Sequence, residues 1–138
     1  MIAALTSIVM LVLIAAIHGY WMLGGRKGHG AVIPEVNGRA VFHPTAIGTA
    51  AVALALLGAA GLIAVQAQLI MTTELRTFAR IGTRFLAAVF AARAIGDFRY
   101  VGIFKQVKGS RFARLDTWIY SPLCCLLAVL IADVALRH

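Results

Sequence analysis

The side chains that can do chemistry gather at a few positions of an otherwise apolar chain. Arg93 and Asp97 stand four residues apart, so on a helix they share a face and can form an ion pair. Arginine holds anions, aspartate and histidine exchange protons, and tyrosine and tryptophan bond polar groups while packing apolar ones. The candidate ligand-binding residues are His18, Trp21, His43, Arg93, Asp97, Arg99, Tyr100, Asp116 and Tyr120.

These residues are compatible with several chemistries. Arg93, Arg99 and His43 can hold a lipid phosphate or a carboxylate, and Asp97 or Asp116 can pass a proton to or from His18. A purely structural interpretation has equal weight, in which the same groups satisfy one another and fix the helix ends. For His18 that interpretation is a side chain that reaches toward the headgroups or bonds to a backbone carbonyl.

Hydropathy predicts the elements that must position these residues. The chain has 138 residues, 62% of them hydrophobic, and a mean hydropathy of +0.91. A spanning helix needs about 20 residues, and the apolar runs predict four spans, at 2–23, 45–70, 78–98 and 116–136. We therefore expect one domain, residues 1–138, with an all-α fold: an integral membrane, up-down antiparallel four-helix bundle. The first 25 residues carry no charged side chain, which favours a retained span over a cleaved signal peptide.

The charge distribution predicts the orientation in the membrane. Lys and Arg number 13 against 5 Asp and Glu, a net charge of +8, and most of these bases fall in the loops 24–44 and 99–115. The positive-inside rule places both loops in the cytoplasm and both termini outside, in a bacterial inner membrane. The ends of the spans that carry the nine candidates then meet at the cytoplasmic side. No segment remains for a soluble nucleic-acid-binding module, so we expect membrane lipid and no nucleic acid as a partner.

Two further patterns concern helix surfaces. Arg76, Arg80 and Arg84 recur every four residues and are expected to reach toward headgroups at a helix end. Small residues at the same spacing predict two seams for close helix packing: Ala51, Ala55 and Ala59 in one helix, and Ala88, Ala92 and Gly96 in another.

No pattern predicts a cofactor. The chain has no spacing typical of zinc, haem or iron–sulfur ligands, so we expect no metal site and no cofactor. Cys124 and Cys125 are adjacent, which disfavours a disulfide between them. They are interpreted as small apolar helix residues rather than as a redox pair, although their role stays open.

Two stretches resemble a known family. HGYWMLGG (18–25) and RAIGDFRYVGIFKQVKGSRFARLDTWIYSPLC (93–124) contain a Tyr/Trp-x-x-Gly-Gly turn, Gly-Asp-Phe-Arg-Tyr and Leu-Asp-x-x-x-Tyr-Ser-Pro-Leu. They are similar to a family of small four-span bacterial membrane proteins that is catalogued as a domain of unknown function. The resemblance covers nearly the whole chain. It implies four spans in a bacterial inner membrane and supplies no activity and no functional residue.

Three functions stay open. The first is binding or translocation of a small or lipidic ligand at the polar end of the bundle, which for so small a chain would require a homo-oligomer. The second is an accessory subunit of a larger membrane complex. The third is a membrane-embedded enzyme, an isomerase or a lipid-modifying enzyme, with Asp97 or Asp116 as base, His18 as acid and Arg93 as electrostatic support. No catalytic signature backs the third, so the catalytic residues stay unknown.

Overall fold

The computed structural model describes residues 1–70 and 74–137 and is almost entirely helical. Two β-strands, each two residues long, form a short antiparallel ribbon in the first loop. The elements in chain order are α1 (Ile2–Met22), the 3-10 turn η1 (His29–Ala31), β1 (Glu35–Val36), β2 (Arg39–Ala40), α2 (Ala46–Gln66), α3 (Arg76–Ile95), α4 (Arg111–Leu115), the π-helical turn η2 (Asp116–Tyr120) and α5 (Ser121–Arg137).

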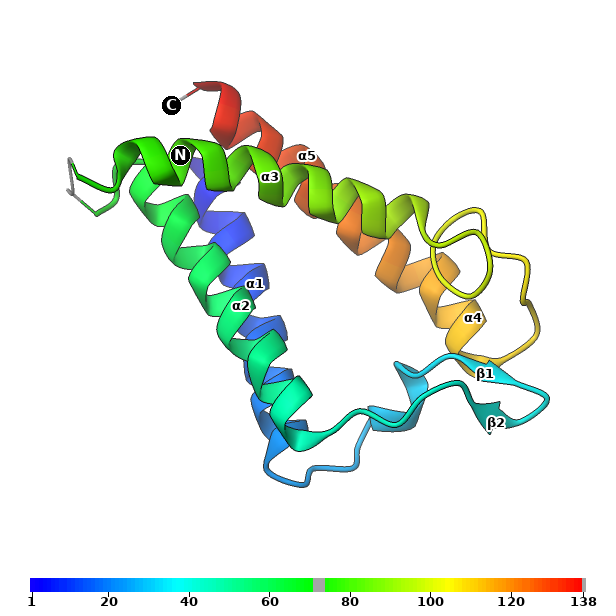
Figure 1. Cartoon of the computed structure of the whole chain (residues 1–138). Coiled ribbons are helices and arrows are strands. Elements are labelled where there is room, and N and C mark those ends of the chain that lie inside the picture. Colours follow the sequence, from blue (N-terminus) through cyan, green and yellow to red (C-terminus); the bar gives the residue numbers. More distant parts are fainter. Residues whose placement is uncertain (71–73, 138) are drawn as a thin grey trace.

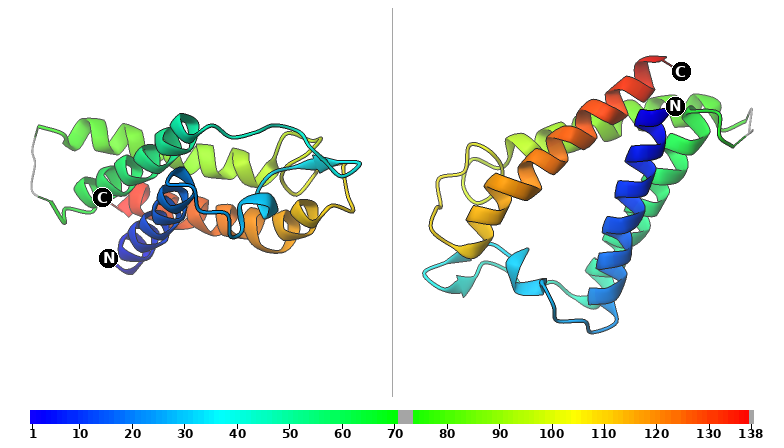
Figure 2. Two further views of the ribbon diagram at one scale, coloured as in Figure 1. Left: turned by 90° about the horizontal axis from the view of Figure 1, so that it is seen from below. Right: turned by 180° about the vertical axis from the view of Figure 1, so that it is seen from behind.

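The helices form two antiparallel pairs that meet at one end and diverge toward the other (Figure 1 and Figure 2). One pair is α1 with α2, and the other is α3 with the continuous helix formed by α4, η2 and α5. The closed end holds the start of α1, the end of α2, the start of α3 and the end of α5. At the open end the first loop, with η1, β1 and β2, runs from the α1–α2 pair to the start of α4 and back. The four helices therefore converge at one end only.

The hydrophobic core lies at the closed end. Its members come from three helices and are nearly all small or branched: Ala4, Leu11, Ala59, Ala60, Ile63, Ala67, Leu127, Ile131 and Val134. Alanines at this contact let the helix backbones approach closely. The core therefore fixes how the two helix pairs meet, and it does not extend to the open end.

Helix α2 ends earlier than hydropathy predicts. The sequence predicts a span to residue 70, but the helix stops at Gln66, and Gln68 adopts a left-handed φ of 59°. The N–H of Gln68 donates to the Val65 carbonyl at 3.0 Å, and that of Leu69 donates to the Ala64 carbonyl at 2.9 Å. This pair of bonds is a Schellman motif, which caps the last carbonyls of a helix.

The last helix begins earlier than predicted. Hydropathy predicts a start at residue 116, whereas α4 begins at Arg111 and continues without a break into η2 and α5. Ser110 is the N-cap, and its Oγ accepts the Ala113 N–H at 3.0 Å. Asp116 therefore lies inside a continuous helix and not at its positive end.

Three of the four predicted spans are helices long and apolar enough to cross a membrane: α1, α2 and the helix Arg111–Arg137. The remaining predicted span, 78–98, corresponds to α3, which is a helix of 20 residues. It does not share their uniformly apolar character because it carries Arg76, Arg80, Arg84 and Arg93.

The two predicted packing seams are mostly unused within the chain. In α2, Ala59 is buried, but Ala51 and Ala55 are exposed. In α3, Ala88 and Ala92 are both exposed. The helices thus pack through a different set of small residues, because the divergence of the two pairs leaves much of each helix surface without a neighbouring helix.

Candidate functional site

A completely buried carboxylate, Asp116 in η2, organises the polar residues beside the end of α3. One oxygen, Oδ1, accepts the Arg93 Nη2–H at 2.9 Å. The other, Oδ2, accepts the Gly102 N–H at 2.7 Å, Lys105 Nζ at 3.1 Å and the Ser121 hydroxyl at 3.3 Å. Four donors, from α3, the loop 96–110 and α5, therefore compensate one buried negative charge, as a charge away from water requires.

Lys105 is part of this cluster, and sequence reasoning missed it. It was counted only as one of the bases of the loop 99–115, but the residue is only 5% exposed. Its Nζ donates to the Gly102 carbonyl at 3.0 Å, to Asp116 and to Thr117 Oγ1 at 2.7 Å. These three acceptors match the three donors of an ammonium group. No spacing pattern in the sequence predicts a buried lysine whose counter-ion, Asp116, lies 11 residues away.

The predicted ion pair between Arg93 and Asp97 is wrong. Arg93 bonds to Asp116 instead, across 23 residues of sequence. The rule for residues four apart holds only on a continuous helix, and α3 ends at Ile95. Gly96 follows with a left-handed φ of 92° and turns the chain away, so Asp97 leaves the face that carries Arg93.

Asp97 closes a loop. Its Oδ1 accepts the backbone N–H groups of Arg99 at 3.0 Å, Tyr100 at 2.7 Å and Val101 at 2.9 Å. Desolvation opposes ionisation, but the donors from Val101, Tyr100 and Arg99 outweigh it and lower the pKa of Asp97 below its ordinary value of 3.8. Asp97 is thus an ionised structural acceptor, a poor match to the general base that the enzyme hypothesis requires.

Two glycines bring this loop back onto the end of α3. Gly96 and Gly102 both have φ of 92°, and each backbone lies against the other. A Cβ on Gly96 would overlap the Val101 carbonyl oxygen, and one on Gly102 would overlap the Ile95 carbonyl oxygen. The closed loop at the end of α3 in Figure 1 follows from this contact. It presents the Gly102 N–H to the Asp116 carboxylate.

The cluster carries more positive than negative charge. Asp116 supplies one negative charge, whereas Arg93 and Lys105 supply one positive charge each. The Lys105 side chain is 3% exposed, but that of Arg93 is 35% exposed. Within the residues that the structure describes, Nη1 of Arg93 has no hydrogen-bond partner. The arginine therefore brings a surplus positive charge to the edge of the cluster, while that Nη1 atom is itself buried.

The π-helical turn η2 places Asp116 in this position. Pro122 has no N–H and cannot make the bond that an α-helix requires of it. The preceding N–H, that of Ser121, donates to the Asp116 carbonyl five residues back. A π-turn adds a residue to the helical repeat and often marks a functional site. Here it coincides with the buried carboxylate.

A second group of candidates lies at the end of α1. His18 Nδ1 is 2.8 Å from the Ile14 carbonyl oxygen, the structural arrangement anticipated for this residue. Trp21 Nε1 donates to the Lys27 carbonyl at 2.9 Å. The indole ring lies edge-on between two imidazoles, with centroids 5.2 Å from His18 and 5.9 Å from His29. His29 was not among the predicted residues.

An open cavity of about 340 Å³ adjoins Trp21 and His29. The ends of α1 and α2 and the first loop supply its lining: Trp21, Met22, Gly24, Gly25, Arg26, His29, Pro44, Ala46 and Thr49. His43 precedes α2 in an irregular segment, is exposed, and does not line this cavity.

Seven of the nine predicted residues fall into two groups on different helix pairs, whereas His43 lies apart and Tyr120 of η2 bonds to the first loop. Arg93 and Asp116 meet directly, with Asp97, Arg99 and Tyr100 in the adjoining loop, where the Arg99 guanidinium lies 5.0 Å from the Tyr100 ring centroid. His18 and Trp21 belong to the α1–α2 pair. Besides the hydrophobic core at the closed end, a hydrogen bond connects the α3–α5 pair to the first loop. In it the Tyr120 hydroxyl donates to the Ala31 carbonyl at 3.3 Å.

Metal and cysteine chemistry have little support in this arrangement. In residues 1–70 and 74–137, no three histidine, cysteine or acidic side chains are grouped closely enough to hold a metal ion. Cys124 is half-buried, Cys125 is exposed, and neither forms a disulfide.

The family model of DUF3995, described as a protein of unknown function, matches residues 11–131. The chain therefore belongs to this uncharacterised family, as the resemblance of its two motif-rich stretches implies. The searches of curated proteins and of solved structures returned no match.

Proposed function

We propose that this member of an uncharacterised family is a small integral membrane protein of the bacterial inner membrane that binds a small or lipidic anion beside Arg93. The ligand's acidic group would pair with the exposed side of the guanidinium, and its apolar part would lie along the diverging helices. Translocation of that ligand would require a homo-oligomer, because one bundle of 138 residues is small for a transporter.

Exposure of apolar side chains supports insertion into a membrane. Leu13 of α1 is 60% exposed, Leu54 of α2 is 69% exposed and Val129 of α5 is 61% exposed. A soluble protein rarely exposes so much contiguous apolar surface, whereas lipid tails cover it readily. With α3 as the fourth span, the open end carries the basic loops 24–44 and 99–115. The positive-inside rule then places that end in the cytoplasm and the closed end, with the termini, outside.

The surplus charge at Arg93 is the observation that carries the proposed ligand. Asp116 neutralises only one of its two cationic partners, and the side chain of the more accessible partner, Arg93, is 35% exposed. Guanidinium groups bind phosphates and carboxylates through paired hydrogen bonds. At the end of a helix, such a group lies at the depth of lipid headgroups. An anionic headgroup or a small amphiphilic acid matches both properties.

Native mass spectrometry with phosphatidylglycerol as probe tests the proposal. The wild-type protein should retain bound phosphatidylglycerol as an adduct. The affinity of Arg93→Gln for this lipid should be about tenfold lower, since a charge-assisted hydrogen bond contributes about 1.5–3 kcal/mol. Arg84→Gln removes an exposed arginine from the same helix and should keep that adduct. Arg93→Lys preserves a cation for Asp116 and controls for folding. Equal adducts on wild type and Arg93→Gln would contradict the proposal.

The accessory-subunit alternative has its own support. Ala88 and Ala92 lie four residues apart on an exposed face of α3, and exposed small residues at this spacing suit contact with a helix of another protein. Co-purification of a stoichiometric partner from native membranes, lost in Ala88→Leu, would favour this function over ligand binding.

The enzyme alternative gains no support from the geometry. Both Asp116 oxygens already accept hydrogen bonds, and Asp97 is a loop acceptor. His18, the assumed acid, belongs to the other helix pair and bonds to its own helix. The groups assigned to acid–base catalysis are therefore not assembled around a common substrate position.

A further inference from the structure

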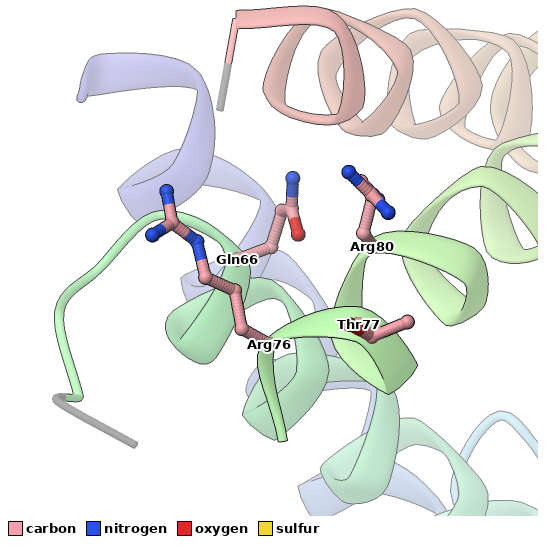
Figure 3. Close-up of a pocket in the computed structure, with 4 residues that line it drawn as sticks. All are labelled: Gln66, Arg76, Thr77 and Arg80. Carbon is pink, nitrogen blue, oxygen red and sulfur yellow. The ribbon is translucent and has the colours of Figure 1, made fainter. Parts of the chain in front are cut away.

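A second polar site lies at the closed end of the molecule, where α2 ends and α3 begins. A cavity of about 140 Å³ is lined there by Gln66, Arg76, Thr77 and Arg80 (Figure 3). None of these residues belongs to the site beside Arg93, and the two sites are at opposite ends of α3. Ligand binding at this second site is therefore independent of the proposed function.

The amide of Gln66 indicates that this cavity accommodates a ligand. The residue is only 3% exposed, and its Nε2 has no hydrogen-bond partner in the part of the chain that the structure describes. Burying a polar group without a partner costs free energy, so native structures rarely leave one unmatched. Figure 3 shows the amide directed between the side chains of Arg76 and Arg80. An acceptor placed between the two arginines would satisfy it.

The remaining lining groups are also donors. Arg76 and Arg80 are one helical turn apart and exposed, and no carboxylate within residues 1–70 and 74–137 forms an ion pair with either. The site is also the start of a 20-residue helix, whose N-cap residue Leu75 offers no capping side chain and whose first turn holds no acid. A helix start of this kind presents backbone N–H groups and a partial positive charge.

We propose that this cavity binds the phosphate group of a phosphomonoester or phosphodiester. Two guanidinium groups, a buried amide and a hydroxyl line it at the start of a helix, and a tetrahedral anion with several acceptor oxygens is the ligand that such a set recognises. The cavity lies at the end of α2, one of the helices apolar enough to span a membrane. A lipid headgroup and a free phosphate can both reach it, and they share this chemistry.

Thermal unfolding in a nonionic detergent tests whether free phosphate binds in the cavity. Inorganic phosphate should raise the melting temperature of the wild-type protein above that in chloride of equal ionic strength. Arg80→Gln should weaken the apparent affinity at least tenfold. Arg84→Gln removes the next arginine of the same stripe, which lies outside the cavity, and should leave the affinity unchanged.

Native mass spectrometry tests the lipid source, with phosphatidylglycerol as probe. If the headgroup is the ligand, wild type and Arg84→Gln should retain one adduct that Arg80→Gln loses, whether or not inorganic phosphate stabilises the protein. Arg93→Gln should keep the adduct that Arg80→Gln loses and should weaken only the one proposed beside Arg93. A wild-type protein with both sites occupied therefore carries two adducts and each variant affects one of them, so failure of one site is distinguishable from failure of the other.

Gln66→Glu is a control for loss of binding that results from misfolding. The new carboxylate can pair with Arg76 and Arg80, so the unliganded protein should be at least as stable as wild type. It occupies the position of the ligand, and phosphate or lipid binding should be lost. The proposal is overturned if Gln66→Glu binds as wild type does, if Arg80→Gln and Arg84→Gln behave alike, or if neither probe binds the wild-type protein.

Discussion

At the scale of single residues, Asp116 determines which charges can be buried. Its carboxylate is 0% exposed and is the common acceptor for Arg93 and Lys105. The Lys105 side chain is almost as inaccessible, so its ammonium relies on this carboxylate and on two neutral oxygens. Removing one member of such a cluster leaves a buried charge without compensation.

We therefore expect Asp116→Ala to destabilise the protein by about 3–5 kcal/mol, the range for breaking a buried ion pair. The double variant Asp116→Leu with Lys105→Met removes both buried charges and should recover part of that loss. Chemical unfolding in detergent, followed by circular dichroism, measures both. A single variant as stable as wild type would contradict a structural role for this cluster.

The sequence predicts which charged residues belong to the cluster better than it predicts which of them pair with one another. Arg93, Asp97 and Asp116 stand out as charges in or beside apolar runs, and Arg93 and Asp116 do meet. The pairing with Asp97 is wrong because Gly96 ends the helix between the two residues. Lys105 and Gln66 were overlooked as site residues, since a buried lysine looks like any loop base and a glutamine at a helix end has no signature in sequence.

At the scale of elements, the loop between α3 and α4 is a rigid connection. Asp97 bonds three successive backbone N–H groups, and Gly96 and Gly102 lie against each other. The Ile103 N–H also donates to the Ala94 carbonyl at 2.9 Å, which ties the loop to the end of α3. A rigid loop sets the relative position of Arg93 and Lys105, the two cations that share Asp116.

Gly102→Ala should disrupt this connection. The substitution forces a side chain into a left-handed φ and into the Ile95 carbonyl, whereas Gly109→Ala meets the same kind of φ, 100°, with no atom within 4 Å. The strained φ costs about 1–2 kcal/mol in either variant. Because only the Cβ at position 102 also overlaps the Ile95 carbonyl, Gly102→Ala should be more destabilising than Gly109→Ala. Unfolding of the two variants side by side measures the difference. Equal losses would mean that the close backbone contact contributes nothing.

Hydropathy predicts elements well and their ends less well. It locates α1, α2 and the last long helix, because a run of apolar residues is what a membrane-spanning helix requires. It extends α2 too far, since the left-handed Gln68 ends the helix inside an apolar stretch. It starts the last helix too late, since the capping Ser110 precedes a basic turn that no hydropathy window favours.

At the scale of the whole molecule, the two helix pairs hold together mainly through one small core. That core joins α1, α2 and α5 at the closed end. The predicted bundle, in contrast, assumes contact along the full helix length. The angle between helix pairs depends on which side chains interlock across the interface, and neither hydropathy nor the spacing of alanines specifies that choice. The structure uses Ala59 and Ala60 there and leaves Ala51 and Ala55 exposed.

The core makes a prediction that two neighbouring leucines can test. Leu127 is 0% exposed and belongs to the core, whereas Leu126 is 48% exposed on the same helix. Leu127→Ala should lower the free energy of unfolding by about 2–5 kcal/mol through lost packing and a cavity, and Leu126→Ala should change it little. The comparison uses chemical unfolding in the same detergent. Similar losses at both positions would mean that the helix pairs meet through a different surface.

The divergence of the helix pairs has a consequence for the bilayer as well as for the protein. At the closed end four helices share a small cross-section, while at the open end the same helices and the first loop cover a broader outline (Figure 2). Inserted across a membrane, such a shape displaces more area from one leaflet than from the other. It is accommodated with least bending stress where the leaflet at the open end is convex. Membrane curvature would thereby favour some locations in the cell envelope over others for this protein.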